Sequence, residues 1–454
     1  MMDNITAHKI PLWVIVLLSL VGLVSCFVPL LVAGVWALVI IGTIVAAIYK
    51  KNEWVWYGIA ASPILEVWSR MVKGAPVLDE IGKYYLLLAI ILVFIHHVKE
   101  ETHKPVFKIG FVLIALLLPS LFVNIPGFDR EQWVFNILPT LELSLLLMLV
   151  ARERWHIERF AKTIQVGVLP IIFIVIYLLV KTPAISDVNF ALGANFKAAG
   201  GGTNQVATVL GLGIVYIMLS LLLKRPVSAR MLCYALIAFL FFRSFLTFSR
   251  GGVFASVASI LIAVAFAMIV NRKTFYRYML VLLVFVVAGL VSFNAVDKIT
   301  GNKLSQRYQG DTAATLSGEQ AKTWRKITSG RSTLIMADWI IFKEYPLFGV
   351  GPGGAKEFRN NLGAPQDSAA HTEFTRLMSE HGLGGMLAAI VMCLFPFYWV
   401  NKQKYHLWKG ISAALFCMAI LTAAHSAMRT NTTIVCYTLA AVPVFIRAGN
   451  KDEN

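Results

Sequence analysis

Residues 11–49 read PLWVIVLLSLVGLVSCFVPLLVAGVWALVIIGTIVAAIY, and this stretch contains no charged side chain. A helix needs about 20 apolar residues to cross a lipid bilayer. The stretch is therefore long enough for two spans in succession. A cleaved signal peptide is a poor interpretation, because the stretch lacks a basic leader and a clear small-residue cleavage site, and its first apolar run continues directly into a second.

The rest of the chain repeats this pattern. Of its 454 residues, 58% are hydrophobic and only 14% are charged, whereas soluble domains are about 25% charged. This composition excludes a soluble enzyme, a disordered chain and a DNA-binding domain. Apolar runs fall at about 11–27, 29–49, 54–72, 82–98, 106–124, 133–151, 162–181, 204–223, 229–248, 251–270, 275–293, 383–400, 407–426 and 430–446. We predict an all-α integral membrane protein, a polytopic bundle of about 12–14 transmembrane helices. The third run contains Pro63 and Glu66, so a re-entrant or interfacial segment is an alternative there.

The charge distribution predicts the orientation of the spans. The net charge is +17, and Lys and Arg are enriched in the cytoplasmic loops of membrane proteins. Basic residues gather in every second short loop, for example at 50–51, 152–162 and 402–409. Because this alternation never breaks, we expect both termini to be cytoplasmic. The five cysteines lie in or beside apolar runs without metal-ligand spacing, so they are interpreted as small core residues.

One connection is much longer than the others. Residues 294–382 form a stretch on the predicted external side, and a loop of this length is usually functional. The chain therefore divides into residues 1–293 with eleven spans, residues 294–382 as a long external loop with amphipathic helices, and residues 383–454 with three spans and a cytoplasmic C-terminus.

The turn Thr247–Gly252 is the first candidate site on the external face. Its two glycines allow a sharp turn and a close approach to a ligand. Arg250 would lie at the membrane surface, where its planar guanidinium suits a phosphate, although a snorkelling arginine at a helix end is also common. Arg243 would share one helix face with Arg250, about two turns deeper. It either extends a basic track towards a lipid phosphate or pairs with a buried carboxylate such as Glu66 or Glu142.

The long loop contains a second candidate. Residues 332–344 predict a short helix at the membrane interface, anchored by Trp339. Arg331 would begin this helix, where free backbone N–H groups favour an anion. The glycines of 349–354 predict a flexible turn after Pro346.

The third candidate is His371, which we expect in the first turn of a helix capped by Asp367 or Ser368. The positive end of the helix disfavours imidazolium, so His371 would be neutral and available as a base. An ordinary interfacial histidine is the alternative, and His381 fits that role better.

The same segment predicts further local structure. Arg376 and Glu380 are spaced as an i,i+4 ion pair, and Gly382 is a plausible stop or bend before the next span. The external carboxylates form no paired cluster that would hold a divalent metal well. This argues that arginines, rather than a metal, would carry the charge of a phosphate.

These pieces, in this order, resemble the superfamily of O-antigen ligases and O-antigen polymerases, and the ligases most closely. The resemblance covers residues 200–430 and rests on Gly200–Asn204, Ser249–Gly252, Gln306–Tyr308, Gly330–Arg331, Pro346–Gly351, His371–Phe374, Gly382–Gly385 and Arg429. It implies a GT-C-like, all-helical glycosyltransferase of the bacterial inner membrane with its active site on the periplasmic face.

The resemblance also implies the substrates and the site. The donor would be an undecaprenyl-pyrophosphate-linked glycan, and neither a cofactor nor a metal would be required. By position, Arg250 and Arg331 would bind the donor pyrophosphate, and His371 would be the catalytic base. Arg307 and Arg429 are weaker candidates for the same pocket, together with the deeper Arg243. Thr372 stands where the family often has Asn, so it receives no role.

The acceptor decides between the members of this superfamily. A ligase transfers the glycan to lipid A core, a polymerase extends a lipid-linked repeat, and a third relative modifies protein hydroxyls. We expect a ligase, with a polymerase as the alternative. A transporter of lipid-linked sugars is a different class, which charges inside the spans would support. The single long external loop, with its histidine and arginines, argues against it.

Overall fold

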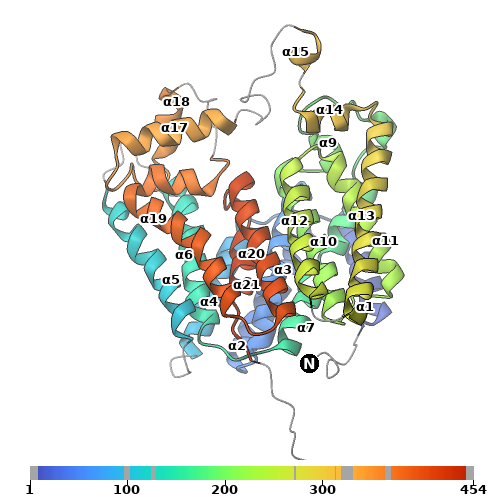
Figure 1. Cartoon of the computed structure of the whole chain (residues 1–454), viewed down its shortest axis with the longest axis horizontal. Helices are drawn as coiled ribbons and strands as arrows, with labels where there is room; N and C mark the ends of the chain where they lie inside the picture. Colours follow the sequence, from blue (N-terminus) through green and yellow to red (C-terminus); the bar gives the residue numbers. More distant parts are fainter. Residues whose placement is uncertain are drawn as a thin grey trace, which may run out of the picture.

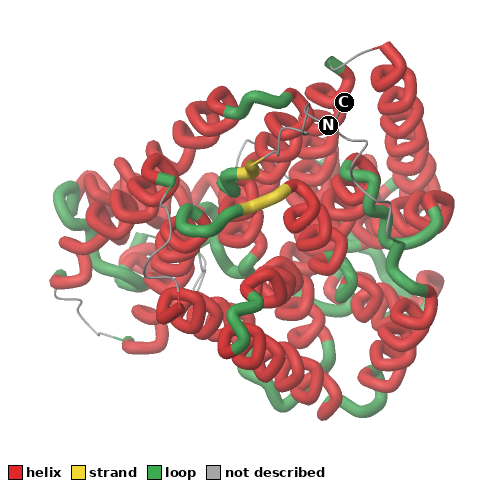
Figure 2. The backbone as a smooth tube through the Cα atoms, turned by 90° about the horizontal axis from the view of Figure 1, so that it is seen from below, coloured by secondary structure: helices red, strands yellow, loops and turns green. Residues whose placement is uncertain are grey.

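A computed structural model of the chain describes residues 9–96, 103–123, 129–269, 272–311, 313–318, 331–362 and 370–445. Helices account for nearly all of the regular structure in these ranges. Two short strands, β1 (Trp155–His156) and β2 (Val444–Phe445), pair in parallel, as Figure 2 shows among the helices. The prediction of an all-α protein is confirmed. Helices are expected in lipid, because a chain there must satisfy its backbone N–H and C=O groups internally, and a helix does so.

The first half of the bundle follows the predicted apolar runs. Its helices are α1 (Leu12–Ser25), α2 (Leu30–Ile48), α3 (Asn52–Met71), α4 (Ile81–His96), α5 (Lys104–Leu117), η1 (Leu118–Phe122), α6 (Arg130–Val150), α7 (Ile157–Gly167), α8 (Ile171–Val180) and η2 (Ile185–Asp187).

The second half contains the long connection. Its helices are α9 (Phe196–Ala199), α10 (Thr203–Leu222), α11 (Arg230–Leu246), α12 (Arg250–Met268), α13 (Arg272–Ile299), α14 (Lys303–Gln309), α15 (Ala313–Leu316), α17 (Arg331–Glu344), α18 (Ala355–Asn361), α19 (Glu373–Lys402), α20 (His406–Ser426) and α21 (Thr432–Ala440).

The chain is a multi-pass membrane protein. Among the described residues, nine helices are long and apolar enough to cross a membrane by length and composition. This number is lower than the 12–14 predicted, because several of the apolar runs form shorter helices. Helices α1, α4 and α11 have 14, 16 and 17 residues, and α21 has only 9. The weak third run forms a continuous helix, α3, which passes through Pro63 and buries Glu66.

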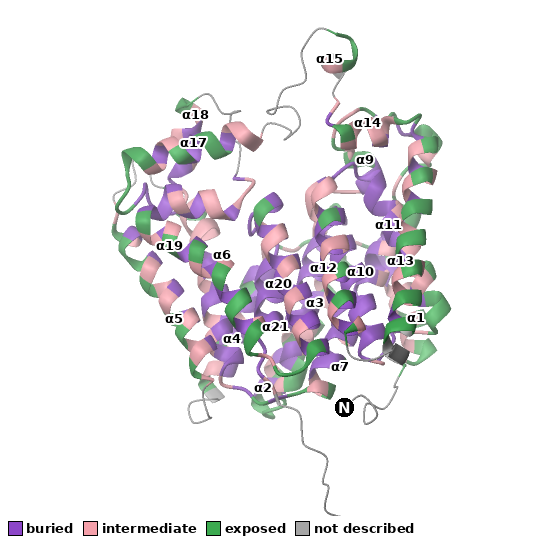
Figure 3. Ribbon diagram, viewed as in Figure 1, coloured by how far each residue is buried: buried purple, intermediate pink, exposed green. Residues whose placement is uncertain are grey.

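The core lies among the central helices. Figure 3 shows α1 and α13 with exposed outward faces, whereas α10 and α20 are mostly buried. In α10, 18 of the 20 residues are buried. Small residues permit this close packing. A Cβ atom on Gly252 would lie 2.3 Å from the carbonyl oxygen of Ala207, so α12 and α10 touch backbone to backbone there. All five cysteines are free and buried or half-buried, as the sequence predicts.

The helices of the long connection gather at one end of the bundle. In Figure 1, α9, α14, α17 and α18 lie at the top, and α7 lies at the opposite end. Helix α19 reaches this end and bends at Gly382, whose backbone is non-helical (φ 60°, ψ −137°). The predicted bend is therefore confirmed.

The glycine-rich turn after Pro346 packs into the bend of α19. Leu383 donates its N–H to the carbonyl of Pro346 at 2.7 Å, and Val350 donates to the carbonyl of Ser379 at 3.1 Å. A Cβ atom on Gly349 would lie 2.4 Å from the backbone of Glu380. The glycines of this turn (Gly349 has φ 67°) therefore provide close contact between two backbones, a role that the sequence did not predict.

Candidate functional site

A pocket of about 380 Å³ lies at the end of the bundle where α10 and α12 begin. We call it the arginine pocket, and its lining is Ala194, Phe196, Gly202, Thr203, Asn204, Gln205, Phe248, Ser249, Arg250, Gly251, Arg307, Arg331, His371 and Arg429. Five of the six residues predicted for the site are therefore brought together, from segments up to 179 positions apart (Arg250 to Arg429). No Asp or Glu is among the described residues that line it.

Two helix starts contribute to this site, since Thr203 begins α10 and Arg250 begins α12. Arg331 is the first described residue of α17. The first N–H groups of a helix lack intrahelical partners and carry partial positive charge. Together with four guanidinium groups, they create an environment suited to a phosphate or pyrophosphate. Within the described ranges, no group of three or more His, Cys, Asp or Glu side chains could hold a metal ion.

The start of α12 is fixed by its neighbours. The hydroxyl of Ser249 donates to the side-chain oxygen of Asn204 at 2.8 Å, which ties α12 to α10. Phe248 has a positive φ of 57°, which turns the chain into the helix. A Cβ atom on Gly251 would lie 2.2 Å from Cδ2 of His425. The paired glycines at 251–252 therefore allow close helix packing, and the expectation that both serve approach to a ligand needs this correction.

The positive charges of the arginines in the pocket repel one another. Arg250 donates from Nη1 to the carbonyl of Arg307 at 3.3 Å. Burial, followed by the charge of Arg250, lowers the pKa values of Arg307 and Arg331. Burial, followed by the charge of Arg331, lowers the pKa of Arg429. An anion bound among these arginines would stabilise their charged forms, offsetting both the burial and the mutual repulsion.

His371 enters the pocket from just outside a helix. Helix α19 begins at Glu373 with Thr372 as its N-cap, so His371 is not in the first turn. The predicted caps Asp367 and Ser368 lie outside the described residues. Burial, then the charges of Arg429 and Arg331, lower the pKa of His371 to about 4. The imidazole is therefore neutral at pH 7, as predicted. The causes are burial and the arginines, whereas the sequence had pointed to the positive end of a helix.

The ring of His371 is also available for a new hydrogen bond. Its Nδ1 atom is buried and has no hydrogen-bond partner among the described residues. A neutral ring with an unoccupied nitrogen can accept a proton from a bound hydroxyl group.

The loop between α20 and α21 holds Arg429 beside His371. Arg429 donates from Nη2 to the carbonyl of Ala370 at 2.8 Å. Two buried carboxylates bind the same loop, since Glu373 accepts the N–H of Met428 at 3.2 Å and Glu66 accepts the N–H of Asn431 at 3.0 Å.

Arg243 does not line the arginine pocket. It lies in α11, is 6% exposed, and donates to Thr182 Oγ1 and to the carbonyl of Ala198, both at 2.9 Å. Neither sequence interpretation of Arg243 holds. It does not extend the track to Arg250, because its Nη2 atom is directed to Thr182 and to the carbonyl of Ala198 in α9. It does not pair with Glu66, which binds Arg70 at 2.6 Å, or with Glu142, which has no hydrogen-bond partner among the described residues.

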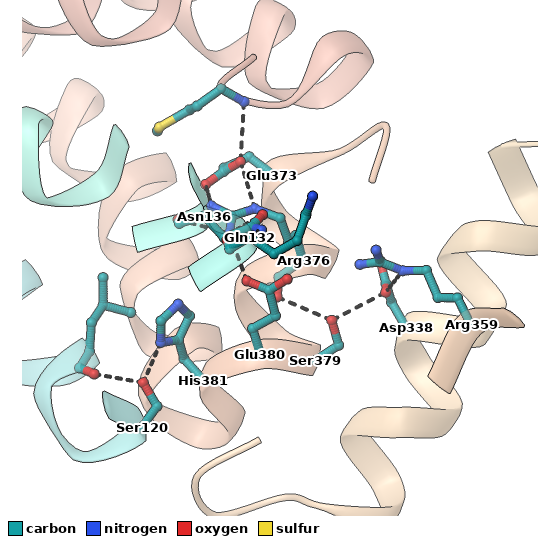
Figure 4. Close-up of polar contacts among 12 residues, drawn as sticks. Ser120, Gln132, Asn136, Asp338, Arg359, Glu373, Arg376, Ser379, Glu380 and His381 are labelled. Carbon is teal, nitrogen blue, oxygen red and sulfur yellow. Dashed lines mark hydrogen bonds and ion pairs between the residues drawn. The ribbon is translucent and has the colours of Figure 1, made fainter. Parts of the chain in front are cut away.

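Behind the site, a buried polar network joins α6, α17, α18 and α19 (Figure 4). Arg376 pairs with Glu373 and, at 2.7 Å, with Glu380, so the predicted i,i+4 pair is confirmed. Asp338 of α17 accepts hydrogen bonds from Arg359 at 2.6 Å and from Ser379 at 3.2 Å. This network links α17, which contains Arg331, to α19, which follows His371.

His425 was not predicted to lie beside the site. This residue lies near the end of α20 with its ring against Gly251, and Nε2 is 3.1 Å from Thr208 Oγ1. Nδ1 donates to the carbonyl of Leu421 at 2.7 Å. The only indication in the sequence that His425 lies near the site was its position four residues before Arg429. His381, by contrast, has the structural role expected, because it is buried and its Nδ1 bonds the hydroxyl of Ser120.

The fold and the pocket define a polytopic membrane protein with a cationic pocket lined by four arginines. Residues 235–389, about a third of the chain, match the family model described as O-antigen ligase. The matched range includes Arg250, Arg307, Arg331 and His371 and ends before Arg429. A search of curated proteins found no match.

Proposed function

We propose that this protein is an O-antigen ligase of the bacterial inner membrane. It transfers an undecaprenyl-pyrophosphate-linked glycan en bloc onto a sugar hydroxyl of lipid A core, at the periplasmic face. The observation that carries the proposal is that four arginines and His371 meet in one pocket. The histidine is neutral, and its Nδ1 atom has no hydrogen-bond partner among the described residues. The family match over residues 235–389 supports the same class of chemistry.

The arginine pocket would bind the pyrophosphate of the donor. A pyrophosphate carries several negative charges, and the pocket offers Arg250, Arg307, Arg331 and Arg429 without a lining carboxylate from the described residues. Charge-assisted hydrogen bonds from guanidinium groups are stronger than neutral ones. Partial burial reduces the screening by water and strengthens them further. No metal is needed in this proposal, because the arginines supply the positive charge.

His371 would act as the general base. The acceptor hydroxyl attacks the anomeric carbon of the donor, a C–O bond forms, and the hydroxyl proton passes to the imidazole. The bond between the anomeric carbon and the pyrophosphate oxygen breaks, and its electron pair leaves with undecaprenyl pyrophosphate. The arginines stabilise the charge that develops on the leaving group. Because this is one displacement, the anomeric centre inverts.

Donor binding and base strength would be coupled. Burial and the arginines hold the pKa of His371 at about 4, which makes it a weak base. A bound pyrophosphate offsets the positive charges and raises this pKa towards neutrality, where a general base is most effective. Proton transfer is then favoured only when the leaving group is in position.

The test is transfer in detergent with purified donor and lipid A core acceptor. Product formation without a sealed bilayer excludes pure transport. We expect His371→Ala to lower the turnover by roughly 10²–10⁴-fold and to leave donor binding nearly unchanged. If His371→Ala transfers glycan at the wild-type rate, the assignment of the base is wrong.

The acceptor is tested separately in a deletion strain. Loss of a ligase leaves lipid-linked polymer that never reaches the core. Loss of a polymerase, which would use the same donor chemistry, leaves lipopolysaccharide capped with a single repeat. The second result would overturn the ligase assignment and retain the site.

A further inference from the structure

A second cavity, of about 470 Å³, lies between α5 and α19. Lys104, Lys108 and Ile109 of α5 and Leu394, Phe395 and Tyr398 of α19 line it. We call it the lateral groove. It shares no residue with the arginine pocket, and the function proposed above does not use it.

The geometry of the two helices creates the groove. Towards the arginine-pocket end they touch, since a Cβ atom on Gly384 would lie 2.1 Å from the carbonyl oxygen of Leu116. At the other end, the rings of His103 and Trp399 meet edge to face with centroids 5.1 Å apart. The helices separate between these contacts. Phe395 forms the floor and is 4% exposed, whereas Leu394 on the open side is 60% exposed.

The groove opens where a membrane protein meets lipid. Both α5, with η1, and α19 are helices long and apolar enough to span the bilayer. Its aliphatic and aromatic lining is suited to dispersion contacts with a hydrocarbon chain. A bilayer supplies such chains at high local concentration, so an acyl chain is the occupant that fits this lining.

Positive charge lies at one end of the groove. Lys104 and Lys108 are spaced i,i+4, both are exposed, and neither forms an ion pair within the described ranges. Lys402 adds a third cation, with Nζ 5.5 Å from the ring centroid of Tyr398. No carboxylate is among the described residues that line the groove. Basic pockets between spanning helices are suited to anionic lipid headgroups.

We propose that the lateral groove is a binding site for an anionic phospholipid. One acyl chain occupies the apolar part, and the phosphate and headgroup lie between Lys104 and Lys108. A zwitterionic phospholipid with the same chains would fill the groove but would gain less from the two lysines. This site is independent of donor and acceptor binding.

The experiment uses the full-length protein in detergent and native mass spectrometry. Dioleoyl phosphatidylglycerol and dioleoyl phosphatidylcholine are compared, because they differ only in the headgroup. We expect the wild type to bind phosphatidylglycerol at least about fivefold more tightly at low salt, with the preference falling as ionic strength rises. The salt series needs no variant, and equal binding of the two lipids would overturn the proposal.

Two variants locate the site. Lys104→Gln/Lys108→Gln should remove the preference, whereas the matched control Lys50→Gln/Lys51→Gln, which changes two exposed lysines outside the groove, should retain it. Leu394→Trp adds bulk at the open side and should weaken both lipids equally. Equal losses in the two lysine pairs would mean a diffuse surface effect and refute the site, as would unchanged binding in Leu394→Trp.

Discussion

The guanidinium of Arg429 donates a hydrogen bond to the carbonyl of Ala370, with 2.8 Å between Nη2 and the oxygen. This bond joins the loop before α21 to the residue that precedes His371. The carbonyl of Arg429 in turn accepts a hydrogen bond from Arg70 at 3.3 Å. Three parts of the chain far apart in sequence therefore fix the position of one cation beside one imidazole.

This relationship predicts a shift in pH dependence. His371 works as a base only when it is neutral, so kcat/KM for the donor, which reports the free enzyme, falls as the pH drops through the pKa of about 4. Arg429 lowers this pKa by repelling the imidazolium form. Arg429→Gln should therefore raise the pKa of His371 and move the acid limb of kcat/KM to higher pH.

The matched control is Arg230→Gln, which changes an exposed arginine at the start of α11 and outside the arginine pocket. It should leave the acid limb where it is in the wild type. If the acid limb does not move in Arg429→Gln, the charge of Arg429 does not lower the pKa of His371, and the prediction is wrong.

Arg331 should govern donor affinity. Arg331→Gln removes a charged donor of hydrogen bonds from the pocket, and we expect the Kd for undecaprenyl pyrophosphate to rise roughly 10- to 100-fold. Arg331→Lys should recover only part of the affinity, because lysine lacks the planar fork. Lys343→Gln, at the exposed end of the same helix, serves as the control in a direct binding measurement. Similar losses in the Lys343 and Arg331 variants would point to general electrostatics.

Gly251 should tolerate no side chain. In Gly251→Ala, the new Cβ would meet the ring of His425 at 2.2 Å, so helices α12 and α20 must separate or the ring must move. We expect a cost of about 1–3 kcal/mol, seen as a lower Tm in detergent. Gly34→Ala, in a helix where nothing lies within 4 Å of the added Cβ, should be neutral or slightly stabilising. Equal Tm values for the two variants would contradict the packing argument.

Arg243 should contribute to stability and not to donor binding. Arg243→Gln disrupts the buried hydrogen bonds to Thr182 and Ala198, at a cost of about 1–3 kcal/mol. The folded fraction should bind undecaprenyl pyrophosphate as the wild type does. A variant with wild-type Tm but weakened donor binding would instead make Arg243 a donor ligand.

The sequence by itself determined the class of fold and the approximate positions of most of its apolar helices. Uninterrupted apolar runs favour helices in lipid whatever their neighbours are, because each helix satisfies its own backbone. Local signals also predicted the helix over 332–344, the Arg376–Glu380 pair and the bend at Gly382. These features depend on residues within a few positions of one another.

The tertiary structure alone decided which side chains meet. The gathering of Arg250, Arg307, Arg331 and Arg429 around His371 depends on how α12, α14, α17 and the loop before α21 are arranged. The same arrangement turned Arg243 away towards Thr182 and brought His425 against Gly251. Burial, and with it the low pKa of His371, is a property of the assembled pocket. Hydrophobic runs specify which segments enter the membrane, but only the packing of those segments specifies which charges they enclose.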